Sequence, residues 1–183
     1  MFVLAVVGLL VAGSIVSYLA SAGLRLGVDT HVVATVKAAK RESGWGNYGA
    51  IRPVRAAASS QVTDHGASLL IDLINTDYWA ADTSGDPHPQ VTLTFPRPTD
   101  LDYLLVTSGA GPDFGRTGRP RAVRLTYSDG TSEDLVLKDD PRAVGYETHG
   151  YSVSWVSLRV LSVYPSRQNT WVAISELEPF RLN

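Results

Sequence analysis

The stretch LLIDLINTDYWAAD, residues 69–82, joins an apolar run to a loop in which Tyr78 and Trp79 are adjacent and flanked by acids. Side chains of neighbouring residues in an extended segment point to opposite faces. Because Trp79 follows the apolar run, we expect it to enter a core with its indole N–H bonded to a carbonyl. Tyr78 is then the ring that we expect at the surface.

Apolar and polar residues alternate in the segments that follow this stretch, at residues 91–95, 123–127, 135–137 and 156–160. This period of two is typical of strands with one buried face. Asp129 and Gly130, between the second and third segments, predict a hairpin turn. Only residues 64–74 show a brief helical pattern. The sequence therefore predicts an all-β fold, an antiparallel β-sandwich.

The N-terminal residues 2–24 contain no charged side chain. A helix of this length spans the roughly 30 Å hydrocarbon core of a bilayer, so we expect residues 1–24 to form a transmembrane anchor. A cleavable signal peptide is the alternative, since Ala20, Ser21 and Ala22 resemble a cleavage site. The absence of a basic leading region and the length of the apolar run favour the anchor. A buried core helix is the third interpretation.

Residues 25–54 are expected to form a juxtamembrane helix followed by a linker, ahead of a folded domain at residues 55–183. Valines 28, 32 and 36 have near-helical spacing, and the glycines of SGWGNYG predict a loop. The basic residues near the span all follow it: Arg25, Lys37, Lys40 and Arg41. The positive-inside rule would then leave the folded domain in the cytoplasm.

The composition excludes several classes of function. A net charge of -2 and a pI of about 6.0 argue against binding to nucleic acid. The absence of cysteine excludes disulfides, thiol catalysis and cysteine-bound zinc. The four histidines, at positions 31, 65, 88 and 149, lack metal-ligand spacing and are expected to be ordinary loop residues. We expect no enzyme; a hydrolase would require two acids, or a histidine and an acid, converging in a deep pocket.

The order of several motifs resembles the discoidin-like, galactose-binding-like type C domains of coagulation factors. These motifs are ASSQVTDHGASLLID, the Tyr-Trp pair, VTLTF, GRPRAVRLTYSDG, SVYPS and AISELEPF. The resemblance covers about residues 54–183. The sequence looks most similar to the membrane-anchored actinobacterial members, which are related to the glycan-binding translocation domain of secreted NAD glycohydrolases. It implies a jelly-roll sandwich that binds a ligand.

The resemblance also implies calcium as a cofactor. The typical opening loop of that family reads Asp-Gly-Asp-Pro-x-Thr-x-Trp, and a glutamate follows near the C-terminus; Asp72, Trp79 and Glu176 match these positions. In the relatives that carry calcium, the loop and the glutamate supply oxygen ligands. Leu73, Ile74 and Asp77 stand where glycine, the second aspartate and threonine are usual. Calcium takes about six to eight oxygen ligands. The ligands implied here are Asp72, Asn75, Asp77 and Glu176.

Loop aromatics and arginines are the candidate ligand-binding residues, since sandwiches bind ligands through loops at one end. The candidates are Tyr78, Arg116, Arg119, Tyr146 and Trp171. The arginines can donate paired hydrogen bonds to hydroxyl or carboxylate groups. Alternatively, the GRPR sequence serves only to lead into the next strand.

The expected function is recognition without catalysis by a membrane-anchored module that binds carbohydrate or another cell-envelope component. Its partners would be the lipid bilayer and glycans or another membrane protein. The alternative is a structural accessory subunit that docks on a larger membrane complex. The resemblance favours a single-pass protein with its C-terminal domain outside the cytoplasm, whereas the flanking charges favour the reverse.

Overall fold

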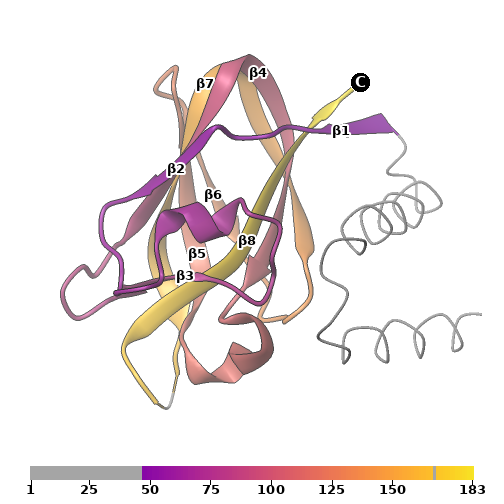
Figure 1. Ribbon diagram of the computed structural model, residues 1–183. Coiled ribbons are helices and arrows are strands. Elements are labelled where there is room, and N and C mark those ends of the chain that lie inside the picture. The colour runs from indigo at the N-terminus through magenta and orange to yellow at the C-terminus, as the bar shows by residue number, and fades with distance from the viewer. Residues whose placement is uncertain (1–46, 167) are drawn as a thin grey trace, which may run out of the picture. The chain divides into compact units, whose positions relative to one another are not determined.

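The structure is a computed structural model that describes residues 47–166 and 168–183 (Figure 1). The predicted anchor and nearly all of the juxtamembrane segment lie outside these residues. Within the described part of the chain, no helix combines the length and apolar character that a membrane crossing requires.

The described chain forms an antiparallel, all-β fold, as predicted. Two 3-10 helices interrupt it, η2 (Ala67–Leu70) and η3 (Gly111–Arg116). The strands are β1 (Tyr48–Ala50), β2 (Arg55–Ala58), β3 (Trp79–Asp82), β4 (Gln90–Ser108), β5 (Arg119–Tyr127), β6 (Ser132–Val136), β7 (Val144–Tyr164) and β8 (Trp171–Leu182). Strand β1 lies within residues 25–54, which were expected to form a helix and a linker, and it pairs with β8.

The two long strands, β4 and β7, each run through both layers of the sandwich. The beginning of β4 pairs with β2 and the end of β7, whereas its end pairs with β8 and the beginning of β7. The β4–β7 register breaks between Thr94 and Thr99, where Pro96 and Pro98 cannot donate ladder hydrogen bonds. One layer is therefore β2-β4-β7-β5-β6, and the other contains β4, β7 and β8 with β1 and β3 (Figure 1).

Alternating apolar residues of both layers form the core. Trp79 is fully buried, and its Nε1 donates to the carbonyl of Ser60 at 3.1 Å, which confirms the core position expected for this ring. The hairpin turn at Asp129 and Gly130 is also confirmed, with Gly130 at a φ of 86°. Of the helical segment expected at residues 64–74, only the single turn of η2 forms.

Candidate functional site

Three half-buried rings, His65, Tyr78 and Trp171, form a cluster that we call the aromatic platform. The rings of His65 and Tyr78 stack with centroids 4.1 Å apart and an interplanar angle of 17°. The ring of Trp171 is tilted against His65 at 6.0 Å. Tyr78 and Trp171 pack on small residues of β3 and β8, Ala80 and Ala173, which lie outside the main core. The platform therefore occupies the opposite face of β3 from Trp79.

His65 has one ring nitrogen fixed by the backbone. Its Nδ1 lies 3.3 Å from the carbonyl oxygen of Tyr78. Because a carbonyl oxygen only accepts hydrogen bonds, Nδ1 carries the proton in this contact. In the neutral ring Nε2 is then an acceptor, which can take a hydrogen bond from a hydroxyl group.

Charged and amide groups lie beside the platform, on η3 and on the segment before β8. Arg116 donates from Nε to Oε1 of Gln168 at 3.2 Å and from Nη1 to Oδ2 of Asp113 at 3.4 Å. Its side chain is 63% exposed. Burial raises the pKa of Tyr78, Asp113 raises it further and Arg116 lowers it, so both charges act on the Tyr78 hydroxyl. Tyr78, Arg116 and Trp171 are thus brought to one region of the surface.

Gly111 fixes η3 against the loop that carries Tyr78. Its φ is +54°, and a Cβ at this position would lie 2.6 Å from the carbonyl oxygen of Asn75. Its N–H donates to Oγ of Ser175 at 2.9 Å. Only glycine accepts both the left-handed backbone and this close approach. The close packing at Gly111 therefore sets the position of η3, which carries Arg116, relative to the loop that carries Tyr78.

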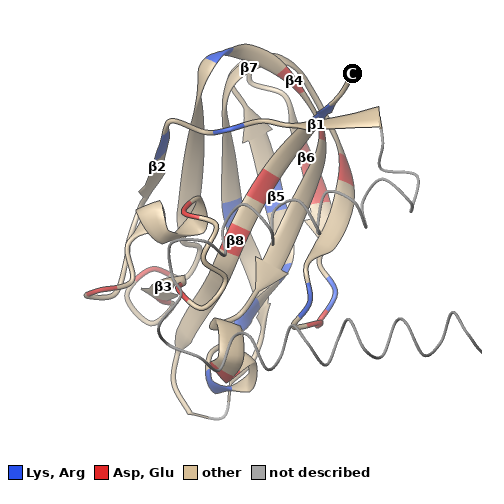
Figure 2. Ribbon diagram, turned by 45° about the vertical axis from the view of Figure 1, so that its right-hand side comes forward, with Lys and Arg blue, Asp and Glu red and all other residues tan. Residues whose placement is uncertain are grey.

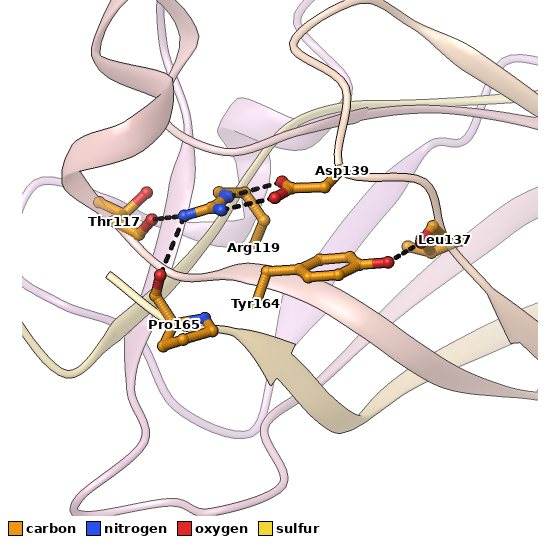
Figure 3. Close-up of polar contacts among 6 residues, drawn as sticks. All are labelled: Thr117, Arg119, Leu137, Asp139, Tyr164 and Pro165. Atoms are coloured by element: carbon orange, nitrogen blue, oxygen red, sulfur yellow. Dashed lines mark hydrogen bonds and ion pairs between the residues drawn. The ribbon is translucent and has the colours of Figure 1, made fainter. Parts of the chain in front are cut away.

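Arg119 is buried and its guanidinium is fully engaged (Figure 3). Nε and Nη2 donate to the two carboxylate oxygens of Asp139 at 2.9 and 2.8 Å. Nη1 donates to the carbonyls of Thr117 and Pro165, and the cation lies 5.0 Å from the ring centre of Phe114. These contacts favour a structural role for Arg119, in which the GRPR sequence leads into the next strand, over contact with a ligand.

Tyr146 also lies apart from the platform residues. It is on β7, where its hydroxyl accepts a hydrogen bond from the backbone N–H of Lys138 at 2.8 Å and its ring packs against the core. His65, by contrast, belongs to the platform although the sequence analysis treated it as an ordinary loop residue. No sequence spacing predicts that residues 65, 78 and 171 lie together. These rings meet because β3 pairs with β8 and because the loop before β3 carries His65 and Tyr78.

Glu176 is the second unusual feature. It belongs to β8, which carries acidic residues (Figure 2), and is only 4% exposed. Neither of its carboxylate oxygens makes a hydrogen bond of good geometry among the described residues, although the backbone N–H of Leu73 and the charge of Arg52 lie close enough to lower its pKa. Burial, followed by the charges of Glu178 and Asp72, raises its pKa to about 8. It lines a small recess together with Leu73, Ile71 and residues 50–53. A buried carboxylate without a partner is costly, and is found where a cation or another ligand binds.

The opening loop covers this recess and supplies one further acid. Asp72 accepts the backbone N–H of Ile74 at 2.9 Å, and burial, opposed by this bond and reinforced by Asp77, raises its pKa. Leu73 has a φ of 67°, which explains why glycine is usual there. The carbonyl of Asn75 faces η3 instead. Residues 47–166 and 168–183 contain no cluster of three acidic or histidine side chains arranged to hold a metal.

Of the four implied calcium ligands, Asp72 lies close enough to Glu176 for its charge to raise the pKa of Glu176, and Asp77 acts on Asp72 in the same way. The buried oxygens of Glu176 are suitable ligands for a cation, although Arg52 lines the same recess. The cation's remaining oxygen ligands would have to come largely from backbone carbonyls of the loop, since the acids present supply too few.

Comparison with solved structures shows that the fold is similar to that of discoidin-like β-sandwich domains. No family model and no curated protein matches the sequence. The family 32 module of C. perfringens NanJ, solved with galactose, superposes with a TM-score of 0.60 at 12% identity, over 73% of this chain and 99% of that one.

Two further structures give the same result. An F5/8 type C domain from Bacteroides fragilis has a TM-score of 0.59 at 15% identity, over 75% of this chain and 99% of that one. A pectin-binding module has a TM-score of 0.54 at 16% identity, over 70% of this chain and 91% of that one. At these identities the likeness establishes the fold and leaves the ligand to be inferred from the site.

Proposed function

We propose that this protein is a non-catalytic module that binds carbohydrate at the aromatic platform. The observation that carries the proposal is the convergence of Tyr78, His65 and Trp171 with Arg116. Support also comes from structures of the same fold, among them modules solved with galactose and with GalNAc-β-1,3-galactose.

The platform offers complementary groups for a sugar ring. Aromatic faces pack against the apolar C–H face of a pyranose, while nearby polar groups fix its orientation. Nε2 of His65 accepts from one hydroxyl, and the exposed guanidinium of Arg116 donates to another oxygen. Because the site is built from surface loops and is not enclosed, single-site affinity is weak and multivalent presentation strengthens it.

A glycan array with the full chain tests this function, with Tyr78→Ala and Trp171→Ala as variants. Tyr151→Ala is the matched control, since Tyr151 is 79% exposed and belongs to β7 rather than to the platform. We expect the two platform variants to lose binding and the control to retain it. No binding by the folded wild-type protein, or equal loss in the control, would refute the platform.

The finer assignment is also a proposal: a membrane-anchored module of the actinobacterial glycan-binding type, with residues 1–24 as a single span and the sandwich outside the cytoplasm. The apolar residues 2–24 support the anchor, and a glycan ligand requires exposure to the envelope. The basic residues after the span oppose this orientation. Protease accessibility in intact cells decides it, because a protected domain would exclude binding to external glycans.

Calcium at Asp72 and Glu176 is the cofactor that we propose. Bound there, it would neutralise the buried carboxylate. Asp72 belongs to the same short loop as Tyr78, so this neutralisation would also hold the platform in place.

A structural accessory subunit is the second candidate. The observation that favours it is the exposure of Leu73 and Ile74, 45% and 49%, at the loop positions where the family usually has glycine and aspartate. Exposed apolar side chains at a loop tip can bind a protein partner. A gently solubilised full chain that is always monomeric and without partners would argue against this candidate.

A further inference from the structure

The outer face of the β2-β4-β7-β5-β6 layer carries a second arrangement of side chains. Val91 and Leu93 of β4 face the core, so Gln90, Thr92 and Thr94 face outward. The strand register places the outward residues in rows that cross the strands.

The middle row consists of short side chains. Its members are Ala57, Thr92, Ser157, Thr126 and Ser132, one from each strand. Thr92 donates to Oγ of Ser157 at 3.2 Å. Longer side chains lie two residues to either side along the strands, so the middle row is the low part of this face.

One flanking row carries cations. Gln90 pairs with Arg159, which in turn lies opposite Arg124. Asp134 holds Arg124 through two hydrogen bonds of 2.7 and 2.8 Å. The side chain of Arg159 makes no hydrogen bond or ion pair within the described chain. Its charge lowers the pKa of Asp86, whose carboxylate accepts hydrogen bonds, chiefly from Ser59.

The other flanking row combines a ring with another free cation. Thr94 lies between Arg55 on β2 and Trp155 on β7. Trp155 is half-buried, although it points away from the core. Arg55 is exposed, and its side chain makes no hydrogen bond or ion pair among the described residues. Strand spacings of about 4.8 Å and 3.3 Å per residue place the Cα atoms of Arg55 and Arg159 roughly 16 Å apart.

The charge of this face is opposite to that of the chain. The three arginines and one aspartate on its strands sum to +2, and the carboxylate of Asp86 beside Arg159 reduces this to +1, whereas the whole chain has a net charge of -2. Two unpaired guanidinium groups on either side of a row of hydroxyls, with one indole beside them, suit a long ligand that carries both carboxylates and hydroxyls. A nucleic acid would call for a broader basic surface and a series of stacking rings.

We propose that this outer face binds an extended anionic polysaccharide, with Arg55 and Arg159 holding separate acidic groups and Trp155 packing on a sugar ring between them. This site is independent of the aromatic platform and does not rest on the function proposed there. The two sites together would give the protein two contacts with one envelope polymer.

The test is binding of the full chain, in a mild non-ionic detergent, to polygalacturonate, to neutral dextran and to a single-stranded oligodeoxynucleotide. We expect polygalacturonate to bind, dextran to bind at least about tenfold more weakly, and binding to weaken as salt rises. Because each guanidinium–carboxylate bond contributes strongly, Arg55→Gln with Arg159→Gln should reduce affinity at least about tenfold.

A second double variant, Arg97→Gln with Arg142→Gln, removes the same charge from exposed positions elsewhere. It should stay within about twofold of wild type, as should Tyr78→Ala, which reports on the platform alone. Equal loss in the two double variants, equal binding of the oligonucleotide, or no binding of polygalacturonate at low salt would each overturn the proposal.

Discussion

Arg119 and Glu176 are both buried ionisable side chains, but they differ in what surrounds them. Arg119 donates four hydrogen bonds, two of them to one carboxylate (Figure 3). Glu176 makes no hydrogen bond of good geometry within the described residues, and burial raises the pKa of its carboxyl to about 8 despite the nearby N–H of Leu73. Burying a charge is tolerated when it is paired and is otherwise costly. Arg119 therefore stabilises the fold, whereas Glu176 is the residue at which we propose a bound cation.

Arg119→Ala should have the largest effect on stability. Removing one member of a buried ion pair leaves Asp139 and two carbonyls without their donor, which costs about 3 kcal/mol of the free energy of unfolding. Urea denaturation measures it. Arg116→Ala, three residues away and 63% exposed, should change the same free energy by less than about 0.5 kcal/mol. Similar losses in both variants would contradict the structural role of Arg119.

Calcium should act through Glu176 with the next largest effect. At about one hundred times its dissociation constant, a ligand that binds only the folded state adds about 2.7 kcal/mol of stability. We expect calcium to raise the Tm of the wild-type protein and a chelator to reverse this. Glu176→Gln should remove the increase while folding normally, because its amide carries no buried charge.

Glu147→Gln is the control for that experiment, since Glu147 is an exposed acid on β7. It should keep the calcium response. A wild-type Tm that calcium leaves unchanged would exclude the cation site, and an unchanged response in Glu176→Gln would place calcium elsewhere.

The difference between these two residues also shows how far the sequence could predict the site. Period-two patterning and the Asp129-Gly130 turn predicted the sandwich because strands with one buried face leave that local signature. Whether an arginine is exposed or buried depends on partners distant in sequence. Asp139 and Pro165 meet Arg119 only after β5 and β7 pair, so Arg116 and Arg119 looked alike.

The arrangement of the aromatic platform likewise could not be predicted from the sequence. Tyr78 and Trp171 were predicted as single loop residues, but their arrangement depends on the pairing of β3 with β8. His65 was missed because its role is set by one contact with the Tyr78 carbonyl. The bulge at Ser175, where Thr107 pairs with Glu176 and Ser108 with Ile174, likewise has no sequence signal.

Gly111→Ala should have an intermediate effect and should separate folding from ligand binding. A side chain at a φ of +54° costs about 1 kcal/mol, and its Cβ would also contact the Asn75 carbonyl. We expect a modest loss of stability together with weaker glycan binding, because η3 and Arg116 would move away from Tyr78. Gly115→Ala, whose Cβ would meet no atom within 4 Å, is the control. Unchanged glycan binding in Gly111→Ala would argue that η3 takes no part in the site.

The smallest effect is expected at a paired charge that is exposed rather than buried, His149 with Glu133. Their side chains meet at 2.8 Å, with His149 78% exposed. The hydrogen bond and the charge of Glu133 raise the pKa of His149, with smaller contributions from Glu147 and Asp102. Burial alone would raise the pKa of Glu133, but hydrogen bonds from Tyr127 and His149 lower it below its usual value.

The pH dependence of stability contributed by this pair follows from the directions of the two pKa shifts. A raised histidine pKa gives stability that is fully present below the usual value of 6.5 and is lost as the pH rises through the folded-state pKa. A lowered glutamate pKa gives stability that is present above 4.5 and lost on acidification. The pair therefore stabilises most between these values. Tm should fall from pH 5.5 to 8.5 in wild type, chiefly because the raised pKa of Glu176 makes its ionisation in the folded state unfavourable over this range. The fall should be slightly smaller in His149→Gln, which removes the contribution of the exposed pair, whereas His88→Gln should keep the wild-type slope. An unchanged slope in His149→Gln would show that solvent screens an exposed ion pair completely, and that burial distinguishes Arg119 from it.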